Sequence, residues 1–351
     1  MSNIDGALFK NISETSVIAT LNAIAYGVIV NSHTSGTLKI LDGTELSVQA
    51  TGTLTSSGAC APAKYAKSVL TSDATQPAVD DIVTIGTTVY RFKSTMLAAY
   101  DVKIGASVTI TLANLRAAIN ATGTAGTEYF AGTLVHPTVI ATASDATTLT
   151  VYARVIGTAA NTTVTTESSA HLAWEDTTLG GGTGASIAGV ATTLATVTIG
   201  TTVYTAVTTL AETLGLTAIP YQVLWVTSEA IFLDNLKLAI NASGVAGTNY
   251  ATGTLEHPTV YATTNTNTTQ VVAAKVLGVS GNSIATTETM GNYAWGAATL
   301  ASGAGADARI LVNTITFASG PGFYTFPGSP AAVNGLFAIV GGTLDCTIVY
   351  R

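Results

Sequence analysis

The chain is poor in charged residues. Lysine, arginine, aspartate and glutamate make up 9% of its 351 residues, against about 25% in ordinary soluble domains. The formal net charge is -7 and no basic cluster is present, which argues against nucleic-acid binding through phosphate neutralisation. So neutral a surface is typical of one that meets other protein, where charge is costly to desolvate. A threonine-rich β surface that is simply stable would explain the same composition.

Long apolar runs and a cysteine framework are also missing. No uninterrupted apolar stretch of about 18 residues occurs, so no membrane-spanning helix and no membrane partner are predicted. The opening residues MSNIDGALFKNISE lack a basic segment followed by an apolar core, so no signal peptide is predicted. The only cysteines, Cys60 and Cys346, are expected to be buried free thiols. The hydrophobic fraction of 47% indicates a folded chain, because it offers ample apolar area to bury.

Two segments of the chain are nearly the same. Residues 114–139 read NLRAAINATGTAGTEYFAGTLVHPTV and residues 235–260 read NLKLAINASGVAGTNYATGTLEHPTV, identical at 18 of 26 positions with an offset of 121. VTIGTTVY at 83–90 recurs at 197–204 with an offset of 114. The offsets differ by 7, so the second copy carries an insertion, which we place within Thr208–Thr227 as a candidate contact loop. Such self-similarity indicates duplication.

Each copy has the length of a domain. The similarity extends over residues 81–182 and 193–303, each of roughly 100 residues, whereas solenoid repeats have about 20–50. Each copy is predicted to be a small α+β unit with one helix packed on a sheet. The helix is predicted from an apolar stripe at helical spacing, formed by Leu112, Leu115, Ala118 and Ile119 and by Leu233, Leu236, Ala239 and Ile240. The candidates for a left-handed residue at the helix ends are Asn120, Gly123, Asn241 and Gly244.

Both ends of the chain are predicted to be β-rich. Short strands are expected at 25–31, 37–43, 45–52, 308–317, 323–328, 335–342 and 344–351. Residues 53–78 are interpreted as loop and linker. Either set of strands alone would leave open sheet edges. We therefore predict a mainly β fold in which residues 1–78 and 305–351 form one discontinuous β-sandwich that carries the two inserted copies. Four small pieces in a row are the alternative.

The first residues of the chain are treated separately. Residues 1–20 are interpreted as an N-terminal arm with some helical potential. Its apolar side chains have no partner in their own small domain, and we expect the arm to lie on a neighbouring molecule. These side chains are Leu8, Phe9, Ile12, Val17, Ile18 and, just beyond, Leu21.

No constellation of residues typical of catalysis recurs between the copies. His136 and His257 are the histidines at equivalent positions, each before a proline, but no acidic or cysteine partner recurs beside them. We interpret them as structural residues of a turn. Metal-ligand spacings such as HExxH and CxxC are absent. GGGTGAS at 181–187 lacks the Lys-Ser/Thr ending of a phosphate loop and is interpreted as a flexible linker. No catalytic, cofactor or metal residues are therefore assigned, and no enzyme activity is expected.

The copies resemble a module of virion structural proteins of tailed bacteriophages. The resemblance lies in the pattern VTIGTTVY…VKIGAS…TLANLRAAIN…GTAGTEY…HPTV…GTAANTTVTT…W…TLGGG. The flanking segments GVIVNSHTSGTLKILDGTE and GLFAIVGGTLDCTIVYR are similar to a phage β-sandwich domain. The resemblance covers nearly the whole chain past residue 20. It implies a capsid decoration or cement protein, or a head fibre, without a catalytic motif.

Function is therefore expected to be structural. The prediction is a virion protein on the capsid surface, made in the host cytoplasm, which binds the major capsid protein or other virion proteins. It is expected to form a homo-oligomer, for which a trimer suits a shell. A tail-associated or carbohydrate-binding protein is the alternative, which would use exposed aromatics such as Tyr129, Tyr250 or Trp225. For Tyr129 and Tyr250 a role as core or turn anchors is favoured. A tail-tube subunit is a third, less favoured interpretation.

Overall fold

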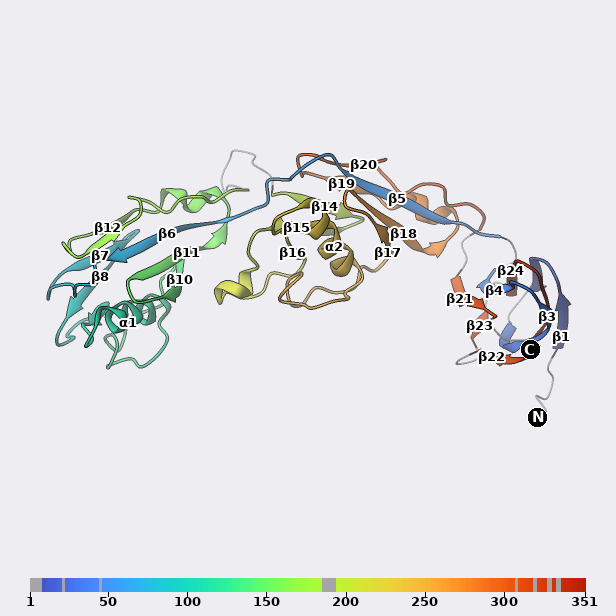
Figure 1. Ribbon diagram of the computed structural model, residues 1–351, viewed down its shortest axis with the longest axis horizontal. Coiled ribbons are helices and arrows are strands. Elements are labelled where there is room, and N and C mark those ends of the chain that lie inside the picture. The colour runs from blue at the N-terminus through green and yellow to red at the C-terminus, as the bar shows by residue number, and fades with distance from the viewer. Residues whose placement is uncertain are drawn as a thin grey trace.

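The protein is mainly β and is built as a row of three bodies (Figure 1). The computed structural model describes residues 8–20, 23–43, 46–184, 194–306, 309–317, 321–326, 330–332 and 336–351. Each body has its own hydrophobic core. We call them the terminal body, which holds both described ends of the chain, the central body and the distal body. In the described part of the chain, no helix has the length and apolarity needed to cross a membrane.

The terminal body combines strands from the two ends of the chain. One sheet has the order β1-β25-β3-β22, with β23 also paired to β3, and the other has the order β2-β24-β4-β21. The two sheets share one core, to which Ile12, Ile18, Val28, Leu38 and Ile348 belong. The strand bounds are β1 Leu8–Ile12, β2 Ser16–Ala19, β3 Ala23–His33, β4 Thr37–Asp42, β21 Arg309–Thr316, β22 Gly322–Thr325, β23 Ala331–Ala332, β24 Leu336–Gly341 and β25 Leu344–Tyr350.

The interpretation of residues 1–20 as a partly helical arm without a partner is wrong for the residues that can be described. β1 pairs with β25 and β2 pairs with β24, both antiparallel. Ile12 and Ile18 are buried in the terminal core, whereas Leu8 and Phe9 are exposed. The reason is that the last strands of the chain supply open edges, which these segments cover. Residues 1–7 and Leu21 lie outside the described residues.

The distal body contains the first sequence copy. Its sheets have the orders β10-β11-β6-β13 and β12-β7-β8-β9, and α1 packs against β9 and β10. The bounds are β6 Tyr65–Ser72, β7 Ile82–Ile85, β8 Thr88–Lys93, β9 Asp101–Lys103, α1 Val108–Asn120, β10 Val139–Ser144, β11 Thr148–Ile156, the 3-10 turn η1 Thr158–Thr162, β12 Thr165–Glu167 and β13 Leu172–Trp174.

The central body contains the second copy and repeats the same pairings. Its sheets have the orders β17-β18-β5-β20 and β16-β15-β14-β19. Val197 pairs with Tyr204 as Val83 pairs with Tyr90, so the register is the same in both bodies. The bounds are β5 Gln49–Ser56, β14 Thr196–Ile199, β15 Thr202–Val207, η2 Ala211–Leu214, β16 Gln222–Leu224, α2 Glu229–Ile240, β17 Val260–Asn265, β18 Thr269–Leu277, η3 Val279–Ser283, β19 Thr286–Glu288 and β20 Tyr293–Trp295.

The predicted boundary at residue 78 is wrong because β5 and β6 do not belong to the terminal body. β5 lies between β18 and β20 of the central body, and β6 lies between β11 and β13 of the distal body. Both are interior strands, without which either sheet would fall apart into a hairpin and a three-residue strand. The distal body is thus inserted into the central body after β5, and both are inserted into the terminal body between β4 and β21.

Both predicted helices are present, with the expected apolar face. Each begins after a serine whose Oγ accepts a backbone N–H, Ser107 in α1 and Ser228 in α2, a frequent N-cap. The predicted stripes are buried in both helices. The left-handed residues near the helix ends are Ala121 and Ala242, together with Gly123 and Gly244, and not the two asparagines.

The asparagines at the helix ends join each helix to a strand. Asn120 Nδ2 donates to Ala141 O at 2.6 Å and its Oδ1 accepts Ala141 N–H at 3.0 Å. Asn241 forms the same pair of bonds with Ala262, at 2.9 and 2.8 Å. Each side chain therefore satisfies one N–H and one C=O of the neighbouring strand, which explains why asparagine stands at this position in both copies.

Candidate functional site

Each of the two equivalent histidines is buried and forms hydrogen bonds to two backbone segments of its body. His136 Nε2 lies 3.1 Å from Ile85 O and its Nδ1 lies 3.2 Å from Val139 N. His257 repeats this with Ile199 O at 3.0 Å and Val260 N at 3.1 Å. The bond pattern requires neutral imidazole with the proton on Nε2, and burial lowers the pKa of both side chains. These contacts agree with a structural role for both residues.

The aromatic residues considered for sugar stacking do not form an exposed platform. Tyr129 and Tyr250 are 4% and 3% exposed and belong to the distal and central cores. Their interpretation as core anchors is confirmed, and their use as exposed stacking residues is contradicted. Trp225 is half-buried against the central core. A carbohydrate site built on these three rings is therefore not supported.

The remaining candidates from the sequence have structural surroundings. Residues 181–184 are not a free linker, because Lys64 and Thr183 exchange backbone hydrogen bonds and Gly182 N–H donates to Asn161 Oδ1 at 2.9 Å; residues 185–187 lie outside the described part. Cys60 and Cys346 are buried free thiols, as predicted. Burial raises the pKa of Cys60 to about 12 and that of Cys346 to about 11, so neither is a reactive thiolate near neutral pH. Among the described residues no His, Cys, Asp and Glu side chains group into a metal site.

An exposed apolar surface lies on the outer side of the terminal sheet β1-β25-β3-β22. Phe9 pairs with Val349, and Ile29 pairs with Phe323. Val28, Val30 and Ile348, their neighbours along the strands, belong to the core, so Phe9, Ile29, Phe323 and Val349 face away from it. Phe9 and Phe323 are 64% and 53% exposed, whereas Ile29 is half-buried and Val349 is 3% exposed, so the two phenylalanines supply the exposed apolar area. We call these four residues the phenylalanine face.

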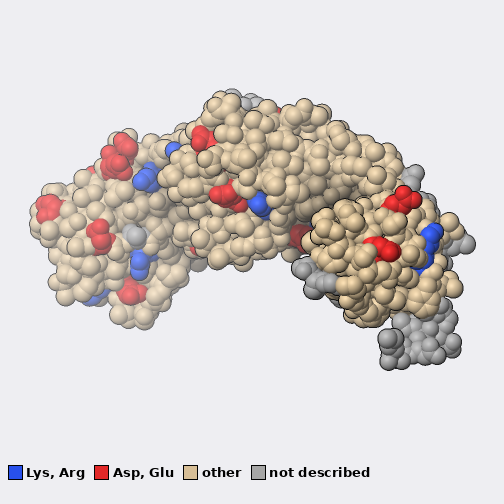
Figure 2. Space-filling model, turned by 45° about the vertical axis from the view of Figure 1, so that its right-hand side comes forward, with Lys and Arg blue, Asp and Glu red and all other residues tan. Residues whose placement is uncertain are grey.

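A glycine shapes the phenylalanine face. A Cβ placed on Gly27 would lie 3.0 Å from Phe323 Cζ and 2.5 Å from Tyr324 O. The ring of Phe323 therefore lies over a strand position that has no side chain, an arrangement that stabilises glycine within a sheet. Because large exposed apolar side chains that gather on one surface mark interaction sites, this face is the candidate protein-binding surface. On the face drawn in Figure 2, charged side chains are sparse, on the terminal body as elsewhere.

The insertion of the second copy contacts the distal body of the same chain. It lies in residues 208–221, between β15 and β16, where the distal body has only residues 94–100. Leu214, in the turn η2, is buried against Tyr65 and Ile140 of the distal body. Nearby, Ala63 N–H donates to Ala206 O at 3.0 Å, and Thr208 N–H donates to Ala63 O at 3.1 Å. The insertion therefore holds the central and distal bodies together, and the predicted contact loop has its partner in the same molecule.

The phenylalanine face could not be predicted from the sequence, whereas the places of β5 and β6 could. The phenylalanine face depends on which strands become neighbours, and no local pattern marks it. By contrast, β5 and β6 carry a detectable signal, because QATGTLTS at 49–56 and YAKSVLTS at 65–72 agree at four of eight positions. This shorter similarity indicates that both strands belong to the repeated units.

Comparison with known protein families, curated proteins and solved structures finds no match for this chain.

Proposed function

We propose that the protein is a non-enzymatic structural protein of a tailed-bacteriophage particle, which decorates or cements the capsid. In this proposal the terminal sheets form a β-sandwich, and the central and distal bodies are a duplicated pair of α+β domains. The observation that carries it is the position of both described chain ends in one body at one end of an elongated molecule (Figure 1). The terminal body would bind the particle, and the other two bodies would project from it as an arm.

The connection between the terminal body and the arm supports this division of roles. Among the described elements, the chain passes between them twice, between β4 and β5 and between β20 and β21. Leu277 of the central body packs with Leu41 and Phe337 of the terminal body. This small apolar cluster leaves the phenylalanine face free for a partner, since that face belongs to the other terminal sheet.

The partner proposed for the phenylalanine face is the major capsid protein or another virion protein. Phe9 and Phe323 would supply the aromatic anchors that commonly dominate protein interfaces, in surroundings where little charge must be desolvated. A closed homo-oligomer such as a trimer is part of the proposal, because β1 and β22 are edge strands of the terminal sheet and closure removes open edges. The proposed location is the capsid surface of the virion.

Electron microscopy of particles that carry a label on this protein tests the location. Density on the head would support the proposal, whereas density confined to the tail would favour the tail-associated alternative. Binding of the purified chain to particles that lack it tests the surface. We expect the double change Phe9→Ser and Phe323→Ser to abolish binding and Leu97→Ser, at an exposed leucine of the distal body, to leave it unchanged. Equal binding by both variants would contradict the proposed anchor.

A further inference from the structure

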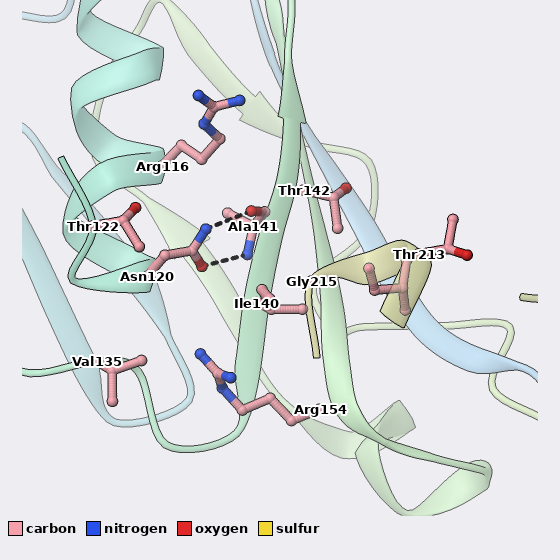
Figure 3. Close-up of a pocket in the computed structure, with 11 residues that line it drawn as sticks. Arg116, Asn120, Thr122, Val135, Ile140, Ala141, Thr142, Arg154, Thr213 and Gly215 are labelled. Atoms are coloured by element: carbon pink, nitrogen blue, oxygen red, sulfur yellow. Dashed lines mark hydrogen bonds between the residues drawn. The ribbon is translucent and has the colours of Figure 1, made fainter. Parts of the chain in front are cut away.

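The described sheets of the central and distal bodies have edge strands that are short, irregular or covered. β9, β12, β13, β16, β19 and β20 have three residues each. β10 and β17 pair with a register shift. The side chain of Asn120 also bonds to the N–H and C=O of Ala141 in β10 (Figure 3), and Asn241 covers Ala262 of β17 in the same way. Short strands, bulges and covering groups all hinder an edge from pairing with another chain.

The two sheets of the terminal body differ in how their edges are protected. β2 and β21, the edges of one sheet, both pair with register shifts. β1 and β22, the edges of the other, pair without any shift, over five residues with β25 and over four with β3. Among the described strands, β1 and β22 are therefore the edge strands of more than three residues that stay regular, and they belong to the same sheet.

Charge does not protect these two edges either. Charged side chains, lysine above all, commonly keep an edge strand from pairing with another chain. β22 contains no charged residue, and the only charged residue of β1 is Lys10. Lys10 Nζ donates to Val17 O of β2 at 2.7 Å, so this side chain is directed to the neighbouring sheet. Exposed apolar side chains lie on both edges, Leu8 and Phe9 on β1 and Phe323 on β22.

Backbone donors of β22 point to its open side. Phe326 N–H donates to Tyr26 O at 2.9 Å, which continues the register of β22 with β3. Since the N–H groups of an antiparallel strand alternate between its two sides, those of Phe323 and Thr325 point away from β3. No described strand lies on that side of β22. A further strand could therefore continue the hydrogen-bond ladder there.

The directions of the two edges are complementary. All three pairings in the order β1-β25-β3-β22 are antiparallel, so β1 runs antiparallel to β22. A rotation about an axis along the strands keeps these directions. β1 of one copy beside β22 of a rotated copy would therefore continue the same antiparallel alternation. Such a head-to-tail contact produces a ring when the rotation closes.

We propose that β1 of one copy pairs with β22 of the next copy, so that the terminal sheets form one continuous sheet around a closed homo-oligomer. This assignment rests on the homo-oligomer of the proposed function and specifies its contact. Opposed residues of an antiparallel pair point to the same face, and aromatic pairs across strands are stabilising. Phe9 of one copy and Phe323 of the next thus lie on adjacent strands of one face, and the phenylalanine face is shared between copies.

Sedimentation velocity of the purified full chain tests the contact. We expect an oligomer for the parent chain. Thr325→Pro removes an N–H that points to the open edge and keeps the ladder with β3, since proline is tolerated at such edge positions. We expect it to weaken association about tenfold or more. Thr325→Val keeps the N–H and should assemble as the parent does. A monomeric parent, or equal association of the proline and valine variants, would overturn the proposal. Near-ultraviolet circular dichroism verifies that each variant is folded.

Chemical cross-linking identifies which edges meet. Asn11→Cys and Thr325→Cys are made as separate chains, which are co-expressed and treated with a short bismaleimide. Cys60 and Cys346 are buried with raised pKa values and should not react. We expect cross-linked pairs when both variants are present and none from either variant alone. Pairs from Asn11→Cys alone would show that β1 meets β1, pairs from Thr325→Cys alone would show that β22 meets β22, and both results, like the lack of any product, contradict the proposal.

The outcome is separable from the proposed location, because both experiments use the purified protein in solution. Cross-linking as expected, together with density on the tail of labelled particles, would overturn the capsid location and support the strand contact. Density on the head without any cross-linked pair would do the opposite.

Discussion

The distal and central bodies have nearly the same interior and differ where they face each other. In both, a tyrosine stacks on the buried histidine, Tyr90 on His136 and Tyr204 on His257, with ring centroids 6.3 and 6.4 Å apart. The connection between β8 and β9 has 7 residues in the distal body, and the equivalent connection between β15 and β16 has 14 residues in the central body. The extra residues carry Leu214 onto the distal body. The two bodies therefore share their core contacts and differ at the junction.

Comparison of the two bodies shows at which positions the fold tolerates a change of residue. A buried side chain that bonds to two backbone segments, such as His136 or Asn120, has the same identity and partners in both bodies. A surface acid such as Glu256 is replaced by Val135 without a change of backbone pairing.

Removing the central leucine of either helix should have the largest effect. Leu115 and Leu236 are fully buried, so Leu115→Ala and Leu236→Ala should each lower the free energy of unfolding by about 2–5 kcal/mol. Urea unfolding followed by tryptophan fluorescence measures this. Ile110→Ala and Ile231→Ala are the controls, because these side chains are exposed on the same helices, and we expect about 0.5 kcal/mol for each. A small effect at only one leucine would contradict a shared interior.

Leu214 tests the junction. Leu214→Ala removes the side chain that packs on Tyr65 and Ile140, and we expect a cost of about 2 kcal/mol, near the lower end for buried leucines. Small-angle scattering should show a wider range of shapes, because the contact between the two bodies is weakened. Leu97→Ala, in the shorter connection of the distal body, is the control, since Leu97 is exposed. Unchanged scattering for Leu214→Ala would show that other contacts are sufficient to hold the arm.

The buried side chains of His136 and His257 should make the protein less stable at mildly acidic pH. Burial lowers the folded-state pKa of His136 and His257, so below the unfolded value of about 6.5 the unfolded chain binds more protons. Stability should therefore be fully present above that pH and fall below it, by at most about 1.4 kcal/mol per pH unit for each histidine. Urea unfolding at pH values of about 7.5, 6.5 and 5.5, which bracket the unfolded pKa of about 6.5, measures the slope of stability against pH.

Glutamine variants identify the source of this pH dependence. His136→Gln and His257→Gln should each be less stable at neutral pH, since Nδ1 no longer accepts its backbone N–H groups. Each should also lose about half of the slope between those pH values, because one of two titrating groups is gone. If both variants keep the parent slope, the pH dependence arises elsewhere.

The surface ion pair of the central body should have the smallest effect. Glu256→Val introduces the residue that the distal body has at this position and removes the ion pair with Lys275. The side chain of Lys275 is 32% exposed and that of Glu256 is 57% exposed. We expect a loss of about 0.2–1 kcal/mol, as for other exposed pairs, and less at high salt. Thermal unfolding at low and high salt measures it. A loss as large as that of Leu236→Ala would mean that the surface pair is part of the shared core.

Several features could be predicted from the sequence because their signals are local. The apolar stripe of Leu112, Leu115, Ala118 and Ile119 predicts a helix, and α1 buries that stripe. β3, β4 and the last strands lie close to the predicted ranges, since β-branched runs between turn residues need no long-range information. The free state of Cys60 and Cys346 was predicted because two cysteines make no disulfide framework, and both thiols are free and buried.

Other features could not be predicted because they depend on distant partners. Residues 8–19 have weak strand signals and become strands only through β24 and β25, more than 300 residues away. The strand predicted at 45–52 for the terminal domain overlaps β5 of the central body, and the linker predicted at 53–78 contains β6 of the distal body. Both predictions are wrong because a short segment does not specify which sheet receives it. The contact of Leu214 with Tyr65 and Ile140 needs the insertion of one copy to reach the other, so no single segment indicates it.

The sequence by itself determined that the chain contains a duplicated, charge-poor unit with one amphipathic helix per copy, since identity at constant offset and helical periodicity are properties of the letters alone. The tertiary structure decided how these units are nested, which edges the first and last strands cover, and which surfaces meet. The physical reason is that strands complete their hydrogen bonds with partners far along the chain. The phenylalanine face and the junction at Leu214 exist only once those partners have been chosen.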